Sequence, residues 1–385
     1  MNINKERIDQ VLSKSVESNC PVISASVLSS DTTLYRGDFG LADVSAGKNV
    51  EKDSIFRIAS MTKAITSACI MQLIEKDKLT LDTKLKEFFP EISERKIIDG
   101  FNEKKETIYS EASSDITIQQ LLTHTSGFAY EIWNKKIAGL VEKGELATAF
   151  SGDKEFLKAP LSFNPGSAWE YGIGIEWLGV LVEKISDMTL QEYMKENIFN
   201  PLRMVDTSYD VTKEKNERLV KVYGRNGDDY FEMPFDPPER STFYAGGGNL
   251  VSTLNDYSAF LTMFLNKGKS PNGRILKETS VDLMLSNHTG DLLMTKMHTS
   301  APILSNDFDF FPDTNKSWGL GFMINNKDIE NGRPKGSAGW AGLFNSYFWI
   351  DPNNKIAAVI LMQMLPFADE GCLKTLKDFE RSIYS

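Results

Sequence analysis

Ser60 and Lys63 are the two residues of this chain whose types and spacing most clearly suggest chemistry. Lys63 is the only charged residue between Arg57 and Glu75, so its amine stands in an otherwise uncharged stretch. A serine hydroxyl is a weak nucleophile that needs a base beside it, and a neutral amine can be that base. Burial of an amine among apolar groups favours its uncharged form. The pair therefore predicts nucleophilic catalysis with Ser60 as the attacking group.

The element that must position this pair is a helix over residues 60–76. Apolar residues such as Met61 and Ile65 surround the lysine in sequence and would supply a water-poor setting. Positions i and i+3 share one face of a helix, so Ser60 and Lys63 can point the same way. A serine at the helix N-terminus also has a free backbone N–H, which can face a developing oxyanion.

The Ser-x-x-Lys pattern is short, and it occurs by chance in many proteins. In this chain it recurs at 93–96 and 151–154, where charged neighbours surround both copies and nothing favours a neutral amine. The pattern alone is therefore also compatible with an ordinary helix. The apolar surroundings are what single out the copy at Ser60.

The sheet that would carry this helix is predicted from both ends of the chain. Strand-like segments at 21–28 and 32–37 follow an amphipathic helix over 4–18. Near the other end, 318–324, 345–350 and 356–362 are strand-like, the last two joined by a turn, and a helix over 370–383 follows. Helical patterns and long loops dominate the middle. We expect one antiparallel sheet built from both termini, flanked by the terminal helices, with a helical lobe inserted between them.

Five segments follow one another along the chain: Phe56–Lys63 with the nucleophile, Leu121–Phe128, Asn164–Gly166 followed by Tyr171, the glycine-rich Gly246–Thr253, and Trp340–Gly342. In this order they resemble the motifs of the serine β-lactamase superfamily, and in particular those of the class C β-lactamases and the family VIII carboxylesterases. The resemblance spans residues 20–365 and also extends to acyltransferases of polyketide metabolism. The resemblance implies an α+β fold of the β-lactamase and penicillin-binding-protein type. Its sheet lobe would cover residues 1–75 and 305–385 and its helical lobe 76–304, with the active site between them.

The resemblance also implies roles for particular residues. Ser60 would be acylated, and Lys63 and Tyr171 would share the proton transfers as general base and general acid. The backbone N–H groups of Ser60 and Leu343 would form the oxyanion hole. A lysine and a tyrosine that interact titrate as a unit, so the sequence leaves open which of them is the base.

Two departures from the β-lactamases concern substrate choice. The second motif has Ile173 where penicillin-recognising enzymes have an asparagine, and the third has Trp340 where they have a lysine. Losing both polar recognition groups disfavours an anionic substrate. We therefore expect neutral esters, bound by Trp340, Gly342, Phe128, Tyr130 and Ile173. The aromatic residues after His124 could equally well pack the helical lobe.

Composition and residue spacing narrow the remaining function classes. The net charge of -10 argues against nucleic acid and against anionic membranes as partners. His124, His288 and His298 lack the spacing of metal ligands, and no dinucleotide motif occurs, so we expect neither metal nor cofactor. No secretory signal or membrane span is predicted, and three sparse cysteines suit a reducing compartment, so we expect a cytoplasmic protein.

The sequence thus predicts a serine hydrolase that cleaves carboxylic esters through an acyl-enzyme. The alternatives are an acyltransferase that uses the same acyl-enzyme, a β-lactamase or D-amino-acid peptidase, and, with least support, a scaffold without catalysis. The physiological ester and the oligomeric state do not follow from the sequence.

Overall fold

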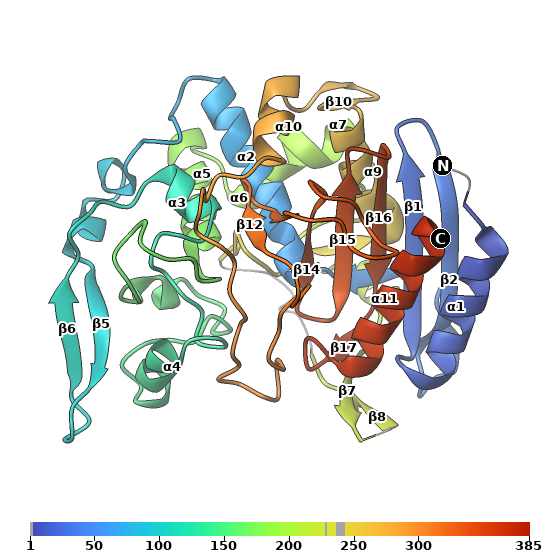
Figure 1. The fold of residues 1–385 in the computed structure, drawn as a ribbon, viewed down its shortest axis with the longest axis horizontal. Coiled ribbons are helices and arrows are strands. Elements are labelled where there is room, and N and C mark those ends of the chain that lie inside the picture. Colours follow the sequence, from blue (N-terminus) through green and yellow to red (C-terminus); the bar gives the residue numbers. More distant parts are fainter. Residues whose placement is uncertain (1–2, 228, 236–242) are drawn as a thin grey trace.

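The fold is organised around one antiparallel sheet to which both ends of the chain contribute (Figure 1). The computed structural model describes residues 3–227, 229–235 and 243–385. The strand order is β12-β13-β14-β15-β16-β1-β2-β3. The bounds are β1 Val22–Ser29, β2 Thr33–Asp43, β3 Lys48–Asn49, β12 Lys316–Trp318, β13 Met323–Asn325, β14 Ala338–Gly342, β15 Ser346–Asp351 and β16 Ile356–Leu361. The ends of the chain meet where β1 pairs antiparallel with β16, with Ser26 opposite Val359.

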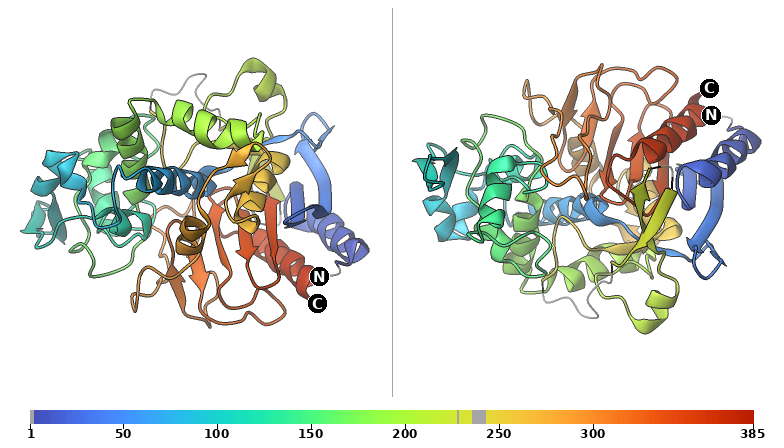
Figure 2. Two further views of the ribbon diagram at one scale, coloured as in Figure 1. Left: turned by 90° about the horizontal axis from the view of Figure 1, so that it is seen from above. Right: turned by 90° about the horizontal axis from the view of Figure 1, so that it is seen from below.

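Helices cover both faces of this sheet. The terminal helices α1 (Lys5–Ser18) and α11 (Glu370–Tyr384) pack against each other, and α9 (Leu254–Leu265) packs against β1 and β16 on the opposite face (Figures 1 and 2). Burial on both faces explains why residues 356–361 read as a continuous apolar run and not as an alternating one. The predicted α+β fold, with an antiparallel sheet and flanking terminal helices, is confirmed.

One predicted strand is wrong. Residues 318–324 do not form a single strand but the facing ends of β12 and β13, which pair as a hairpin. Gly319 donates its N–H to the Phe322 carbonyl at 2.7 Å, and Gly321 has a φ of +99°. A positive φ is far easier for glycine than for other residues, so the two glycines allow the chain to reverse here.

The middle of the chain forms the mainly helical part, which lies beside the sheet in Figure 1. Its helices are α3 Ile118–Leu122, α4 Lys135–Glu142, α5 Gly174–Ser186, α6 Leu190–Met194, α7 Asn200–Leu202, α8 Lys213–Glu217 and α10 Glu278–Met284. Its small sheets pair β5 (Lys96–Phe101) with β6 (Thr107–Glu111), and β10 (Lys269–Ser270) with β11 (Gly273–Arg274). The lobe limits at 75/76 and 304/305 stay a prediction, since α9 falls in the predicted helical lobe yet packs on the sheet.

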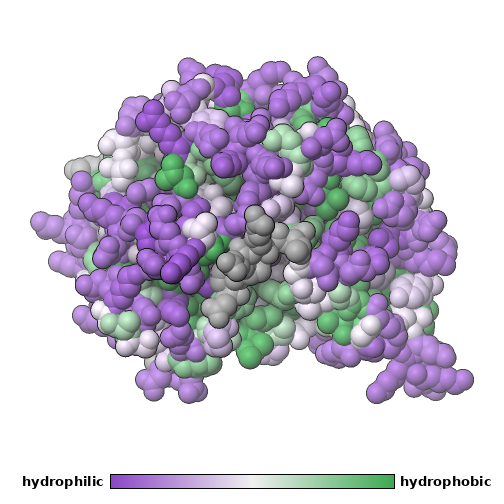
Figure 3. All heavy atoms as spheres, turned by 180° about the vertical axis from the view of Figure 1, so that it is seen from behind, coloured by the Kyte–Doolittle hydropathy of each residue, from purple (hydrophilic) through white to green (hydrophobic). Residues whose placement is uncertain are grey.

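Two further small sheets connect distant segments. The strand β4 (Ile55–Arg57) pairs antiparallel with β9 (Val251–Thr253), immediately before the nucleophile segment. The strand β7 (Val222–Asn226) lies between β8 (Asp229–Met233) and β17 (Met364–Leu365). Polar and charged side chains dominate the face seen in Figure 3. Within the described ranges, no helix combines the length and apolar character that crossing a bilayer requires.

The helix that carries the candidate lysine runs through the centre of the molecule. It is α2 (Thr62–Glu75), preceded by a single 3-10 turn over Ala59–Met61. Every residue from Thr62 to Leu73 is buried. A helix that is buried on all sides needs an apolar surface all round, and this explains the nearly uncharged sequence in which Lys63 stands.

Candidate active site

The nucleophile segment places Ser60 in the 3-10 turn just before α2. Its Oγ lies 3.2 Å from the Nζ of Lys63, as the i, i+3 spacing predicts. The preceding residue, Ala59, has a φ of +44°, a region that costs an L-residue with a Cβ about 1 kcal/mol or more. The backbone therefore stores strain directly beside the predicted nucleophile, as is common at functional sites.

The amine of Lys63 is buried and surrounded by partners from distant parts of the chain. Only 1% of the residue is exposed. Its Nζ donates to the carbonyl of Gly247 at 2.7 Å and to the hydroxyl of Tyr130 at 3.0 Å, and Ser60 Oγ is its third polar neighbour. It also lies 4.9 Å from the ring centroids of both Tyr130 and Tyr171. Three polar neighbours of this amine, Ser60, Tyr130 and Gly247, thus fix its orientation.

Tyr171 lines the same cleft as Ser60. Its hydroxyl accepts a hydrogen bond from Nε1 of Trp340 at 3.0 Å. In the described part of the chain no hydrogen bond joins this hydroxyl to Lys63 or Ser60, although its ring lies beside the lysine amine. The hydroxyl hydrogen of Tyr171 is therefore available to a bound substrate.

The predicted oxyanion hole depends on a close approach between the end of β14 and the nucleophile segment. Ser60, Gly342 and Leu343 line the same cleft. A Cβ built on Gly342 would stand 2.4 Å from the carbonyl oxygen of Ile58, closer than any side chain tolerates. Glycine at this position thus lets the strand end lie against the turn that holds Ser60, so that residues 60 and 343 line one cleft.

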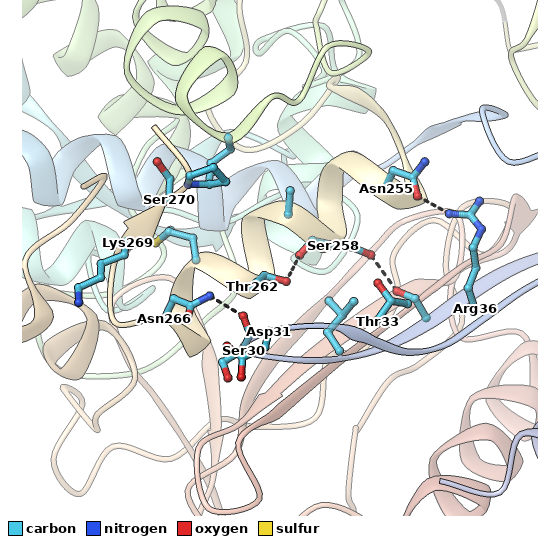
Figure 4. Close-up of a pocket in the computed structure, with 16 residues that line it drawn as sticks. Ser30, Asp31, Thr33, Arg36, Asn255, Ser258, Thr262, Asn266, Lys269 and Ser270 are labelled. Carbon is cyan, nitrogen blue, oxygen red and sulfur yellow. Dashed lines mark hydrogen bonds between the residues drawn. The ribbon is translucent and has the colours of Figure 1, made fainter. Parts of the chain in front are cut away.

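The cleft itself is narrow and uncharged. Its volume is about 10 Å³, and it is lined by Ser60, Trp133, Tyr171, Met297, Trp340, Ala341, Gly342, Leu343 and Phe367. A larger cavity, of about 540 Å³, lies between the β1–β2 hairpin and α9, where Asn266 donates to the Ser30 carbonyl (Figure 4). It shares no lining residue with the cleft at Ser60. If cavity volume alone were used to locate the active site, it would therefore indicate the cavity at α9 and not the cleft at Ser60.

The predicted substrate-binding residues divide into three groups. Trp340 and Gly342 line the cleft. Phe128 and Ile173 are buried away from it, and Phe128 stacks on Trp177 in the helical lobe. Tyr130 is also absent from the cleft lining, because its hydroxyl contacts Lys63 from the interior.

Several residues of the site were not predicted from the sequence. Met297 and Phe367 line the cleft, together with Trp133, which belongs to the aromatic stretch after His124 that the sequence offered as a pocket wall. Behind Lys63, Glu176 accepts a hydrogen bond from the Tyr130 hydroxyl at 2.7 Å. A signal for Glu176 was present, because it is the only charged residue between Glu170 and Glu183, in the same kind of apolar stretch that draws attention to Lys63.

His124 has a structural position next to the site. Its Nδ1 accepts the backbone N–H of Gly172 at 3.3 Å, beside Tyr171. Burial, and then the positive charge of Lys63, lower the pKa of this imidazole well below its usual value, so the ring is neutral near pH 7. The described residues contain no group of three or more His, Cys, Asp or Glu side chains arranged to hold a metal ion.

The fold and this site define a serine enzyme built on the architecture of β-lactamases and penicillin-binding proteins. The family model described as Beta-lactamase matches residues 8–380, and the chain belongs to this family. It is thus an enzyme of the serine β-lactamase fold.

Relatives with established names cover most of the chain. It is 29% identical to lovastatin esterase of Penicillium rubens, over 86% of this chain and 85% of that protein. It is 27% identical to monacolin J acid methylbutanoyltransferase of Aspergillus terreus, over 87% and 83% of the two chains. Among solved structures, unliganded simvastatin synthase of Aspergillus terreus superposes with a TM-score of 0.84 at 25% identity, covering 98% of this chain and 97% of that one.

Proposed function

We propose that the protein is a serine carboxylesterase that transfers the acyl group of a neutral small-molecule ester to Ser60 and then to water. Lys63 and Tyr171 move the protons in both half-reactions. The backbone N–H groups of Ser60 and Leu343 hold the oxyanion of each tetrahedral intermediate. The proposal needs neither metal nor cofactor, because the nucleophile, base and oxyanion donors all belong to the chain.

The observation that carries this proposal is the uncharged cleft. None of its described lining residues carries a charge, and their polar side-chain groups are the hydroxyls of Ser60 and Tyr171 and the indole N–H groups of Trp340 and Trp133, the last donated to Ser305. A carboxylate substrate entering it would lose water and gain no cation. Trp340 instead offers an apolar surface and holds the Tyr171 hydroxyl. These features support a neutral ester over an anionic β-lactam or peptide.

The chemistry follows from the positions of the groups. As Ser60 Oγ attacks the ester carbonyl, its proton passes to the basic partner and the carbonyl oxygen becomes an oxyanion. Collapse of this intermediate expels the alcohol, which takes up a proton. The hydroxyl of Tyr171, held by Trp340 at 3.0 Å, is the donor that faces the cleft. Water then repeats the sequence on the acyl-enzyme and releases the acid.

Acyl transfer to an alcohol is the second candidate, and two observations favour it. Relatives carry both activities in their names, an esterase and a methylbutanoyltransferase. The cleft walls are largely apolar, with Trp133, Met297 and Phe367 among the lining residues, and suit an organic acceptor as well as water. Product analysis of p-nitrophenyl butyrate turnover with added alcohols separates the two. If transesterification dominates at low alcohol concentration, the protein is a transferase.

The decisive experiment compares short-chain p-nitrophenyl esters, nitrocefin and D-alanyl peptides on the native protein and on Ser60→Ala. We expect esters to be turned over fastest, and Ser60→Ala to abolish turnover while leaving the circular dichroism spectrum unchanged. A fluorophosphonate probe should label Ser60 alone. Faster turnover of nitrocefin than of esters, or full activity in Ser60→Ala, would overturn the proposal.

A further inference from the structure

Behind Lys63, away from the cleft, a closed ring of hydrogen bonds joins four segments of the chain. Lys63 Nζ contacts the hydroxyl of Tyr130 and the carbonyl of Gly247. The Tyr130 hydroxyl donates to Oε1 of Glu176 at 2.7 Å, and the Gly247 N–H donates to Oε2 of the same carboxylate at 2.8 Å. Gly247 thus closes the ring, because its N–H binds Glu176 and its carbonyl binds Lys63. Glu176 is only 4% exposed.

The hydrogens of this ring can be counted. A tyrosine hydroxyl has one hydrogen, and that of Tyr130 is donated to Glu176. Its oxygen must therefore accept from Lys63, and the Gly247 carbonyl can only accept. In the neutral form that a general base must have, the lysine amine has two hydrogens and one lone pair. With both hydrogens donated to the ring, the lone pair is left for the third partner, Ser60 Oγ, at 3.2 Å.

We propose that Glu176 is a positioning residue for acylation, which aims the lone pair of Lys63 at Ser60 through Tyr130 and Gly247 and then serves as the counter-charge of the ammonium that forms. The inference rests on the proposed function, in which Ser60 is the acylated residue. It makes Lys63, and not Tyr171, the base for the attack of Ser60.

The proton balance of the step is complete within the site. The O–H bond of Ser60 breaks, its proton joins the lone pair of Lys63, and Oγ forms a bond to the acyl carbon. The carbonyl electron pair moves to the oxyanion. Lys63 then carries three N–H bonds, two of them still held by the ring. When the C–O bond breaks, the alcohol takes the hydroxyl hydrogen of Tyr171. The extra proton of Lys63 then replaces this hydrogen on Tyr171, which restores both the tyrosine hydroxyl and the neutral amine.

The packing around Gly247 indicates how tightly the ring is built. A Cβ on this residue would stand 2.5 Å from Glu176 Oε1, 2.7 Å from the Tyr130 hydroxyl and 2.8 Å from Lys63 Nζ. The position of any side chain at 247 is thus already occupied by the three polar groups of the ring. This geometry requires glycine, and it lets the peptide of residue 247 serve as one side of the ring.

The other charged and titratable groups around the ring leave Glu176 as its only carboxylate. Burial, and then the charge of Glu176, raise the pKa of Tyr130 well above its usual value, so its hydroxyl keeps the hydrogen that it donates. The nearby carboxylate of Glu131 is turned outward to Thr148 and Ala149. Among the residues that the structure describes, His124, Tyr171 and Tyr209 are further titratable groups close to Lys63 or Glu176.

The test is Glu176→Gln, assayed for kcat, KM and the pH dependence of kcat/KM with p-nitrophenyl butyrate. A glutamine that accepts from the Gly247 N–H turns its amide hydrogens toward Tyr130, which then donates to the lone pair of Lys63 and withdraws it from Ser60. We expect kcat to fall on the order of 100-fold with little change in KM. The acid limb of the profile should move to lower pH by about one unit, because the protonated base loses an opposite charge.

Two variants make the result specific. Glu176→Asp keeps the charge, and we expect its acid limb to stay at the position of the native protein even if kcat falls. Glu183→Gln is the matched control on the same helix, because this half-buried carboxylate accepts the Leu190 N–H and touches none of the ring. Its kcat should stay within about twofold of the native value.

The possible results distinguish the positioning role of Glu176 from the proposed esterase function on which it rests. A folded Glu176→Gln protein with native kcat and an unmoved acid limb overturns the positioning role. Equal losses in Glu176→Asp and Glu176→Gln with native pH profiles also overturn it, since they would indicate packing alone. Continued fluorophosphonate labelling of Ser60 in either case would leave the proposed function standing, whereas full ester turnover by Ser60→Ala would overturn both.

Discussion

The two sides of Lys63 differ in almost every physical respect. Toward the cleft, Ser60, Tyr171 and Trp340 form an open, uncharged surface where the Tyr171 hydroxyl keeps a hydrogen for substrate. Toward the interior, Tyr130, Glu176 and Gly247 form a closed ring in which every hydrogen is already donated. In the mechanism that we propose, the groups that meet the substrate are thus separate from those that hold the base. Substrate choice can change on one side without disturbing proton transfer on the other.

Removing the lysine that both sides share should have the largest effect. In Lys63→Ala, Ser60 has no adjacent amine and Glu176 loses its buried partner. We expect kcat/KM for short-chain esters to fall about 1000-fold or more. Urea unfolding should also give a lower midpoint, because the buried Tyr130 hydroxyl and Gly247 carbonyl lose the amine that donates to them. The matched control is Lys154→Ala, in a Ser-x-x-Lys copy that is exposed, and it should behave like the native protein.

The two tyrosines sharpen the comparison, because each phenylalanine variant removes one hydroxyl from one side. We expect Tyr171→Phe and Tyr130→Phe each to lower kcat by about 100-fold, since each removes a group from the proton path. Only Tyr130→Phe should move the acid limb of kcat/KM to lower pH, because it detaches Lys63 from the charge of Glu176. A similar movement in Tyr171→Phe would mean that the two sides titrate as one unit.

Neighbouring glycines probe the interior side with a single methyl group. Gly247→Ala places a carbon within 2.8 Å of three ring atoms, whereas a Cβ on Gly248 has no heavy atom within 4 Å. We expect Gly247→Ala to reduce kcat by about tenfold or more, and Gly248→Ala to change it less than twofold. Initial rates and thermal melting of both proteins measure the contrast. Equal behaviour of the pair would remove the evidence for a tightly built ring.

The smallest expected effect lies on the cleft side. Trp340→Phe keeps an aromatic wall but removes the N–H that binds the Tyr171 hydroxyl at 3.0 Å. One such hydrogen bond contributes about 1 kcal/mol, so kcat/KM should fall roughly fivefold. The position of the acid limb should stay unchanged, as the interior ring is untouched. Steady-state kinetics over a pH series tests both statements.

The sequence predicts the cleft side far better than the interior side. Ser60 and Lys63 lie three residues apart, and Tyr171 and Trp340 stand in recognisable motifs, so local spacing and resemblance were sufficient. The antiparallel hairpin 345–362 was likewise predictable from apolar runs around one turn, and only the glycines at 319 and 321 concealed a further strand boundary. The ring of hydrogen bonds could not be predicted from the sequence, because it joins residues separated by 67, 46 and 184 positions. Only the packed fold brings them together.

The strained backbone at Ala59 has a consequence for how this enzyme could change. A φ of +44° is held in place by the surrounding fold, and unfolding releases it. A change that relaxes residue 59 would therefore raise the free energy of unfolding but lower turnover, so selection for stability and selection for activity oppose each other here. A lineage that adapted to higher temperature would have to reinforce the sheet and α2 around residue 59, because relaxing the residue itself would displace Ser60.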